Sequence, residues 1–396
     1  MSSPAAIQMI EAEVLHPSAL SERAAEAWRA FCAAEPAWRN PLLGPDFARL
    51  VGEVRADARV AVLRRGGHLI GFLPFHRRPD GRAWPIGAAF SDYHALVTAP
   101  GEAIGGADAL AAAGIAGLRA SGLIDPHGAF AELRDSEDHG YVIALEGTPE
   151  AHHQRLKAAN PKRYKNWGRL RNKLEREVGP LTLTPGDVSS EALAQLIGWK
   201  REQFSDTGCH DVLRPVWARS LFQTAFERRD GALKGVMITL HAGGRLAAGF
   251  FGVAAGGVMH VWLSAIDREL SACGPGQVLM LMAPEALQAL GLDVLDLGPS
   301  HAHYKAPFAT GEVGLREGLA IAAGRTGQGV RSLDGAWVLA GERRFAAVAR
   351  LRRRLDHIDA AETSISGRVR GVVDALAGYA RRTSTREPRP PALEEA

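Results

Sequence analysis

The chain has 396 residues, of which 46% are hydrophobic and 23% charged, with a formal net charge of +3. This is the composition of a globular protein with room for two domains and a tail. It excludes a disulfide framework and a zinc site, because the three cysteines are too few and too scattered. No apolar run is long enough for a membrane-spanning helix, and the N-terminus lacks a signal-peptide pattern, so we expect a cytoplasmic protein.

The positive charge is concentrated at the C-terminal end. Residues 341–396 contain twelve arginines and eight acidic residues, a sum of +4, so the rest of the chain sums to about −1. A near-neutral body lacks the broad basic face of a nucleic-acid-binding protein. We therefore expect no nucleic acid partner.

Two stretches have the pattern of a β-hairpin. Residues 59–75 and 233–255 each contain two β-rich runs joined by a pair of glycines, Gly66-Gly67 in the first and Gly243-Gly244 in the second. Each second run also contains a glycine followed by a phenylalanine, at Gly71-Phe72 and Gly249-Phe250. The hairpins lie about 177 residues apart and predict a duplicated domain, with two unrelated hairpins as the alternative.

A basic segment lies between the hairpins, at residues 160–177. Its apolar positions are sparse, which is typical of a solvated linker helix. The alternative is a basic wall for a phosphorylated or otherwise anionic substrate, with Arg163 and Lys165 as binding residues. Both interpretations stay open at this point.

The second hairpin opens a longer series of predicted elements. Strands are expected at 233–242, 245–254, 258–267, 293–298 and 315–323, with a loop at 268–276, a helix at 277–290 and a short helix near 302–309. Three antiparallel strands followed by a strand–helix–strand unit predict a mixed sheet. Pro284 lies inside the longer helix and should kink or shorten it.

The loop before that helix is rich in glycine. Gly274 and Gly276 allow the backbone to approach a ligand closely, and the N–H groups of the first helical turn, near Gln277, favour an anion. A pyrophosphate fits this pattern. Strand–glycine–helix turns with a purely structural role are the alternative.

These residues resemble motifs of the GNAT acyltransferases. Residues 271–276 (SACGPG) are similar to the pyrophosphate loop of that superfamily, with Ser271 in place of its usual first residue. Residues 292–309 resemble the signature of the branch associated with cellulose and exopolysaccharide synthesis, without the acidic residue that often precedes its Tyr-Lys pair. Residues 40–50, 91–93 and 163–177 also resemble this branch, and the Fem-type aminoacyltransferases share its two-lobed plan.

The resemblance implies that acetyl-CoA or another acyl-CoA is a co-substrate, and it assigns roles to residues of this chain. The donor-binding residues would be Leu263, Ser264 and Ala265 at the thioester oxygen and Gly274, Gly276 and Gln277 at the pyrophosphate. Tyr304 would supply the acid for the leaving thiolate, because a phenol stays protonated at neutral pH. Lys305 would stabilise negative charge, and the rest of the candidate catalytic set is Asp296 and His303.

Structural explanations exist for the same residues. Asp296 could cap a turn, Tyr304 could be a core aromatic, and the two histidines, His301 and His303, could be exposed loop residues. A metal site at these histidines and Asp296 lacks a second ligand cluster, so we predict no bound metal. In the first lobe, Asp92 and Tyr93 would either hold the acceptor at a cleft between the lobes or form a turn with a buried aromatic.

The tail has an amphipathic segment. Residues 342–358 place arginines on one helical side and apolar residues on the other, namely Phe345, Val348, Leu355 and Ile358. One interpretation is a helix docked on the body with solvated arginines. The other is a basic surface helix that contacts an anionic membrane surface or a regulatory nucleotide.

The sequence thus predicts an α/β (α+β) protein of two duplicated GNAT-like mixed sheets flanked by helices, with a cleft between two lobes and a helical tail. The expected domains are an N-terminal acceptor-side lobe at 1–160, a basic linker helix at 161–180, a catalytic lobe at 181–330 and an Arg-rich tail at 331–396. The expected activity is acyl transfer to an amine, of an amino sugar in an exopolysaccharide or cell-envelope precursor, in the cytoplasm or at the inner face of the membrane. The alternatives are an inactive GNAT-like binding module in polysaccharide assembly and a Fem-type aminoacyltransferase.

Overall fold

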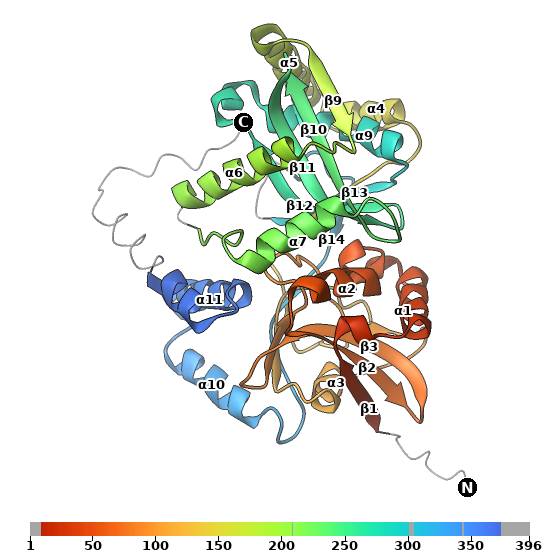
Figure 1. Ribbon diagram of the computed structural model, residues 1–396, viewed down its shortest axis with the longest axis vertical. Coiled ribbons are helices and arrows are strands. Elements are labelled where there is room, and N and C mark those ends of the chain that lie inside the picture. Colours follow the sequence, from red (N-terminus) through yellow and green to blue (C-terminus); the bar gives the residue numbers. More distant parts are fainter. Residues whose placement is uncertain (1–8, 208, 301–304, 343, 374–396) are drawn as a thin grey trace. The chain divides into compact units, whose positions relative to one another are not determined.

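The computed structural model describes residues 9–207, 209–300, 305–342 and 344–373 (Figure 1). The chain divides into two compact units. Unit 1 comprises Met1–Glu137 and Gly314–Ala360, and unit 2 comprises Asp138–Val313 and Ala361–Ala396. Each unit contains one mixed sheet flanked by helices, as predicted. In the described ranges, no helix combines the length and the apolar character needed to cross a membrane.

Unit 1 is built on a sheet of eight strands within its described residues, in the order β1-β2-β3-β4-β6-β15-β7, with β5 paired to β3. β4 and β6 run parallel, and the other neighbouring strands are antiparallel. The strands are β1 (Ile10–Leu15), β2 (Ala58–Arg65), β3 (His68–Arg77), β4 (Arg82–Pro85), β5 (Val97–Thr98), β6 (Gly117–Leu123), β7 (Arg134–Asp135) and β15 (Arg316–Ile321).

Helices cover both faces of this sheet. On one face, Trp28 of α1 stacks on Phe72 of β3 with ring centroids 4.9 Å apart, and its indole N–H donates to the carbonyl of Leu43 (2.9 Å). On the other face, Leu110 of α3 joins a core that contains Phe75. The helices of unit 1 before α10 are η1 (Pro17–Ala19), α1 (Glu22–Ala34), η2 (Pro36–Trp38), η3 (Pro41–Leu43), α2 (Pro45–Val54) and α3 (Gly106–Ala112).

Unit 2 contains a sheet of seven strands within its described residues, in the order β14-β8-β13-β12-β11-β10-β9. β12 and β13 form its parallel pair, and the other neighbours are antiparallel. The strands are β8 (His139–Ala144), β9 (Leu181–Pro185), β10 (Lys234–Ala242), β11 (Arg245–Ala255), β12 (Val258–Ile266), β13 (Val294–Ser300) and β14 (Gly311–Val313).

Both faces of the second sheet are also covered, and α6 and α7 lie across its near face in Figure 1. On that face, Phe222 of α7 packs against Phe251 and Trp262, with ring centroids 5.6 and 5.5 Å apart. The opposite face carries Phe250 in a core shared with α5, α8 and α9. The helices are α4 (Pro149–Ala159), α5 (Pro161–Val178), α6 (Ser190–Thr207), α7 (Val216–Glu227), η4 (Arg268–Cys273), α8 (Pro275–Leu281) and α9 (Ala283–Leu290).

The two sheets match strand by strand. Both hairpins turn at a glycine pair with positive φ at each residue, 55° and 78° in the first and 57° and 80° in the second, which is the geometry of a type I′ turn. In both, the register shifts three residues before the turn, after Leu63 and after Leu240. The predicted duplication is confirmed. The registers also show that Gly71 corresponds to Ala248, so the two Gly-Phe pairs of the sequence are not equivalent.

The boundaries of the units differ from the expected domains. β15, predicted as the last strand of the second lobe, pairs with β6 of unit 1, and β8, placed in the first lobe, pairs with β13 of unit 2. The predicted linker helix is α5, and it belongs to unit 2 because Trp167 and Leu174 are buried in that core. Strand pairing across such distances leaves no local pattern in the sequence.

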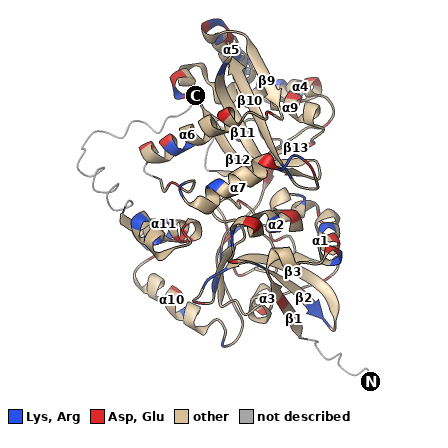
Figure 2. Ribbon diagram, viewed as in Figure 1, with Lys and Arg blue, Asp and Glu red and all other residues tan. Residues whose placement is uncertain are grey.

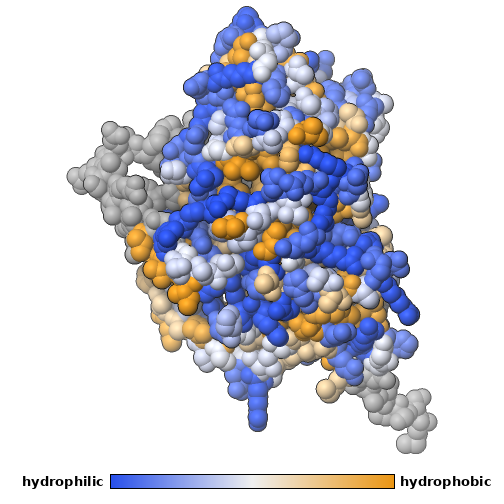
Figure 3. All heavy atoms as spheres, in the orientation of Figure 1, coloured by the Kyte–Doolittle hydropathy of each residue, from blue (hydrophilic) through white to orange (hydrophobic). Residues whose placement is uncertain are grey.

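Among the described residues, β15 is followed by α10 (Gln328–Leu339), α11 (Ala346–Ala361) and a further helical stretch at 365–373. Arg352 of α11 is buried and pairs with Asp334 (2.6 Å) and Glu342. One interpretation of the sequence expected solvated arginines on this side of the helix, and Arg352 is an exception. Ile358 on the other side is also buried. Apolar residues gather on the surface of this region in Figure 3, including the exposed Leu333 and Leu351.

A buried polar relay in unit 1 holds the segment that follows β4. Arg55 donates two hydrogen bonds to Asp57 (2.8 and 2.7 Å), and Asp57 Oδ1 lies 3.2 Å from His76 Nδ1. The N–H of Gly87 donates to His76 Nε2 (2.9 Å), so the ring is neutral with its proton on Nδ1. Burial lowers the pKa of His76 to about 4. Although burial raises the pKa of Asp57, hydrogen bonds from Arg55 and His76 hold it well below its usual range.

We predict that His76 makes unit 1 sensitive to acid. The unfolded chain takes up a proton near the ordinary histidine pKa of about 6.5, whereas the folded ring resists protonation down to about 4. The stability is therefore fully present above pH 6.5 and is lost as the pH falls toward 4, by up to about 3 kcal/mol. Denaturant unfolding at pH 7.0 and 4.5 should show that His76→Gln is less stable at pH 7.0 but loses less on acidification. Equal losses in the variant and the wild type would contradict the assignment.

Candidate functional site

Two neighbouring strands part in the middle of the sheet of unit 2. Among the described residues, β12 and β13 pair over three positions, 258–260 with 294–296, although β12 continues to Ile266 and β13 to Ser300. β12 also contains an extra residue at Trp262, where its register with β11 shifts. The stretch of β12 beyond the last pair holds the backbone predicted to bind the thioester oxygen, at Leu263, Ser264 and Ala265.

A buried ionisable pair lies at the point where the strands part. His260 and Asp296 are opposite each other in the last pair, with Nδ1 and Oδ1 3.4 Å apart, and both side chains are buried. Asp296 Oδ1 also accepts from the N–H of Gly298 (2.8 Å), so it caps a turn as well as facing the histidine. His260 was not predicted as a site residue from the sequence. Its only signal was one histidine in an apolar strand, and the strand opposite was not known.

The glycine loop follows the free end of β12. Gly274 has φ 59° and ψ 48°, the left-handed region, and a Cβ there would lie 2.9 Å from Cδ1 of Leu170 on α5. The chain then enters α8 at Pro275, two residues before the predicted start of the helix. As in any helix, the first N–H groups have no acceptor within the helix, and here they belong to Gly276 and Gln277. α8 ends at Leu281, and a second helix, α9, starts at Ala283. The long helix predicted from the sequence is therefore interrupted near Pro284, as expected.

The basic helix α5 packs against this loop. Lys173 donates to the carbonyl of Ala272 (2.8 Å), and the contact of Leu170 with Gly274 lies on the same side of the helix. The outer face carries exposed basic residues, including Arg163 and Lys165, and Figure 2 marks the lysines and arginines of α5 in blue. α5 is therefore a core element through Trp167 and Leu174, and its exposed arginines and lysines form a basic surface beside the loop.

Lys305 contacts β13 just beyond the residues that pair with β12. Its ammonium donates to the carbonyl of Leu297 (2.7 Å), the first residue after the last strand pair. The turn that carries it is anchored by Phe308, whose ring stacks on Trp167 of α5 with centroids 4.0 Å apart. His301, Ala302, His303 and Tyr304 lie outside the described residues.

The two candidate residues of the first lobe differ in their exposure. Tyr93 is completely buried in unit 1, which supports its interpretation as a core aromatic rather than an acceptor-binding residue. Asp92 is partly exposed, and its carbonyl lies against Gly122 of β6.

The arrangement in unit 2 has a definite chemical capacity. Backbone N–H groups at the start of α8 and the basic side of α5 favour a phosphate-bearing group. The stretch of β12 beyond its pairing with β13 offers backbone groups to a carbonyl, and Lys305 supplies a positive charge at β13. His260 and Asp296 supply a group that can accept a proton and a carboxylate that orients it.

Comparison with known structures gives several similar folds at low identity. A conserved protein of unknown function from Bacteroides thetaiotaomicron is similar with a TM-score of 0.47 and 12% identity, over 79% of this chain and 100% of that one. FemX is similar with a TM-score of 0.48 and 11% identity, over 81% and 99%. A tandem GNAT protein from the clavulanic acid biosynthesis pathway has a TM-score of 0.46 and 14% identity, over 80% and 99%. At these scores the likenesses carry no argument about activity.

No curated protein matches the chain. Residues 161–306 match the family model described as an acetyltransferase (GNAT) domain. The matched range begins at the first residue of α5 and ends just after Lys305, so it contains the parting strands, the glycine loop and the buried pair. The part of this chain that carries the candidate site is therefore similar to a GNAT acetyltransferase domain.

Proposed function

We propose that unit 2 transfers an acyl group from an acyl-CoA to an amine. The observation that carries this proposal is that the stretch of β12 beyond its described pairing with β13 is followed, through η4, by the glycine loop. A thioester lying along β12 would direct its carbonyl oxygen to the backbone near Leu263–Ala265. The pyrophosphate of the same donor would then reach the N–H groups of Gly276 and Gln277.

The proposed reaction has one bond formed and one broken. The amine nitrogen attacks the thioester carbon, a C–N bond forms, the C–S bond breaks, the amine loses a proton and the thiolate gains one. His260 is placed to take the amine proton, held in orientation by Asp296, and Lys305 stabilises negative charge. Tyr304 remains our proposal for the acid on the grounds of its sequence position.

The acceptor is proposed from sequence similarity and from the charges of α5. The similarity of residues 292–309 to the polysaccharide branch favours an amino sugar of an exopolysaccharide or cell-envelope precursor. The exposed basic residues of α5, Arg163 and Lys165 among them, fit an acceptor or donor that carries phosphate. A screen of amino-sugar nucleotides and lipid-linked precursors with acetyl-CoA, detecting free thiol, tests the acceptor directly.

We predict that Gly276→Val weakens acyl-CoA binding by at least tenfold. A Cβ at this position would lie 3.1 Å from Cγ2 of Ile266, so a branched side chain would enter the space between the end of β12 and the start of α8. The measurement is titration calorimetry with acetyl-CoA, together with thermal unfolding to show that the variant is folded.

Gly198→Ala is the matched control for this experiment. Gly198 lies in α6, where an added Cβ meets nothing within 4 Å, so binding should be unchanged. Unaltered affinity in Gly276→Val would show that the donor does not pass this loop.

We predict that Lys305→Ala lowers kcat by about 10²-fold, because it removes a charge-stabilising donor from the site. Lys305→Arg should recover only part of the activity, since the guanidinium is planar and bulkier. Affinity for acetyl-CoA, measured separately, should change little in both. Full turnover in Lys305→Ala would remove this residue from the mechanism.

We predict that Asp296→Asn lowers kcat while the fold persists, because an amide oxygen can still accept from Gly298 but cannot pair with a charged imidazole. His260→Gln should lose activity to a similar degree, because it removes the group proposed to accept the amine proton. If Asp296 only caps the turn, Asp296→Asn will leave the activity per molecule intact. Acetyl-CoA binding without transfer to any acceptor would favour the inactive binding module instead.

A further inference from the structure

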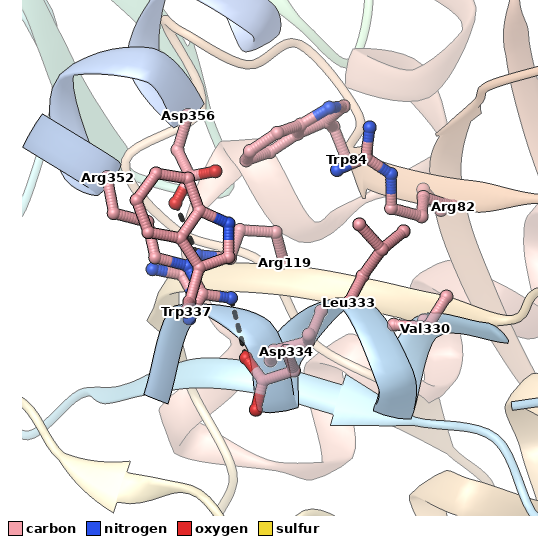
Figure 4. Close-up of a pocket in the computed structure, with 12 residues that line it drawn as sticks. Arg82, Trp84, Arg119, Val330, Leu333, Asp334, Trp337, Arg352 and Asp356 are labelled. Carbon is pink, nitrogen blue, oxygen red and sulfur yellow. Dashed lines mark hydrogen bonds and ion pairs between the residues drawn. The ribbon is translucent and has the colours of Figure 1, made fainter. Parts of the chain in front are cut away.

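The register equivalence of the two sheets identifies the counterpart of the candidate site in unit 1. In unit 2, His260 of β12 pairs with Val253 of β11, and Asp296 of β13 lies opposite His260. The counterpart of His260 is Trp84 of β4, which pairs with His76 of β3. The counterpart of Asp296 is Arg119 of β6, one residue beyond the last parallel pair of β4 and β6. These two residues line the pocket shown in Figure 4.

The counterpart site is filled by a helix of unit 1 itself. Arg119 Nε pairs with Asp356 Oδ2 of α11 (2.9 Å), and the indole N–H of Trp84 donates to Asp359 Oδ2 of the same helix (2.8 Å). Trp337 of α10 and the buried Arg352 of α11 close the pocket from the other side (Figure 4). The remaining cavity is about 60 Å³, whereas ligand pockets usually measure about 300 Å³ or more.

In unit 1, the chain itself fills the place where β4 and β6 part. β4 and β6 pair at only two positions, and the chain after β4 then returns to β6. The N–H of His94 donates to the carbonyl of Gly122 (3.1 Å), and the N–H of Ile124 donates to the carbonyl of His94 (2.9 Å). A Cβ at Gly122 would lie 1.9 Å from the carbonyl oxygen of Asp92, which shows how closely this returning segment lies on β6.

The glycine loop has a closed counterpart too. α3 lies between β4 and β6 in the chain, as α8 and α9 lie between β12 and β13, and it starts after Gly105. The N–H of Gly106 donates to the carbonyl of Ala129 (2.6 Å), and a Cβ there would lie 2.3 Å from the ring of Phe130. This first-turn amide already has an acceptor, and an aromatic ring covers it.

We infer that unit 1 is a copy of the donor-binding fold that is closed to acyl donors by its own chain, so the protein binds one acyl-CoA, in unit 2. Three elements of unit 1 produce the closure: the returning segment at 91–94, the segment at 129–130 and α11. The relay from Arg55 through His76 to Gly87 holds the start of the returning segment in place. This inference rests on the proposed function of unit 2, because it concerns the same ligand.

Titration calorimetry of the full chain with acetyl-CoA tests the inference. The expected stoichiometry is one acetyl-CoA per chain, and Gly276→Val should remove that binding rather than reveal a second site. Hydrogen exchange with and without acetyl-CoA locates the ligand independently of any variant. Residues 272–278 should be protected, and residues 104–108 should exchange at the same rate in both samples.

The outcomes separate the two proposals. Two acetyl-CoA per chain, or protection at residues 104–108, would overturn the closure of unit 1 and leave the proposed function of unit 2 standing. One acetyl-CoA that Gly276→Val still binds would place the donor outside the loop and overturn the inference as well. No binding at all would overturn the proposed function itself, and with it the assignment of a single donor site.

Discussion

The three-residue parallel pairing of β12 with β13 is the constraint from which the rest of the candidate site follows. A strand in the middle of a sheet has N–H and C=O groups on both sides, and those left by a departing neighbour need other partners. In unit 1 the chain supplies them by returning to β6 at His94. In unit 2 β12 runs on to Ile266, and its end delivers the chain to the glycine loop. The same fold therefore covers this strand edge with its own chain in unit 1, and in unit 2 we propose that a ligand takes the corresponding place.

The buried pair at this point has a cost that packing alone does not explain. Taking a histidine and a carboxylate out of water is unfavourable unless both find partners, and apolar residues of similar size would serve a core as well. At the equivalent positions unit 1 carries Trp84 and Arg119, which bind the carboxylates of α11. The fold therefore does not require a histidine that faces a carboxylate at these two positions, and this supports a chemical role for the pair in unit 2.

The sequence predicted those features that depend on neighbouring residues. Gly66-Gly67 and Gly243-Gly244 predicted the hairpins, because a type I′ turn needs positive φ at two successive positions. The break between α8 and α9 followed from the proline expected to shorten the helix. The assignment of β15 to the second lobe was wrong, because its partner β6 lies about 200 residues earlier in the chain. His260 was missed for the same reason, since only the pairing of β12 with β13 places it opposite Asp296.

The structure of the protein with acetyl-CoA bound is the most direct test of the central claim. We expect the pyrophosphate within hydrogen-bond distance of the N–H groups of Gly276 and Gln277, and the thioester carbonyl beside residues 261–265 of β12. His260 and Lys305 should then lie on the side from which an amine approaches. A donor bound with its pyrophosphate away from residues 272–277, or with its thioester remote from β12, would contradict the account.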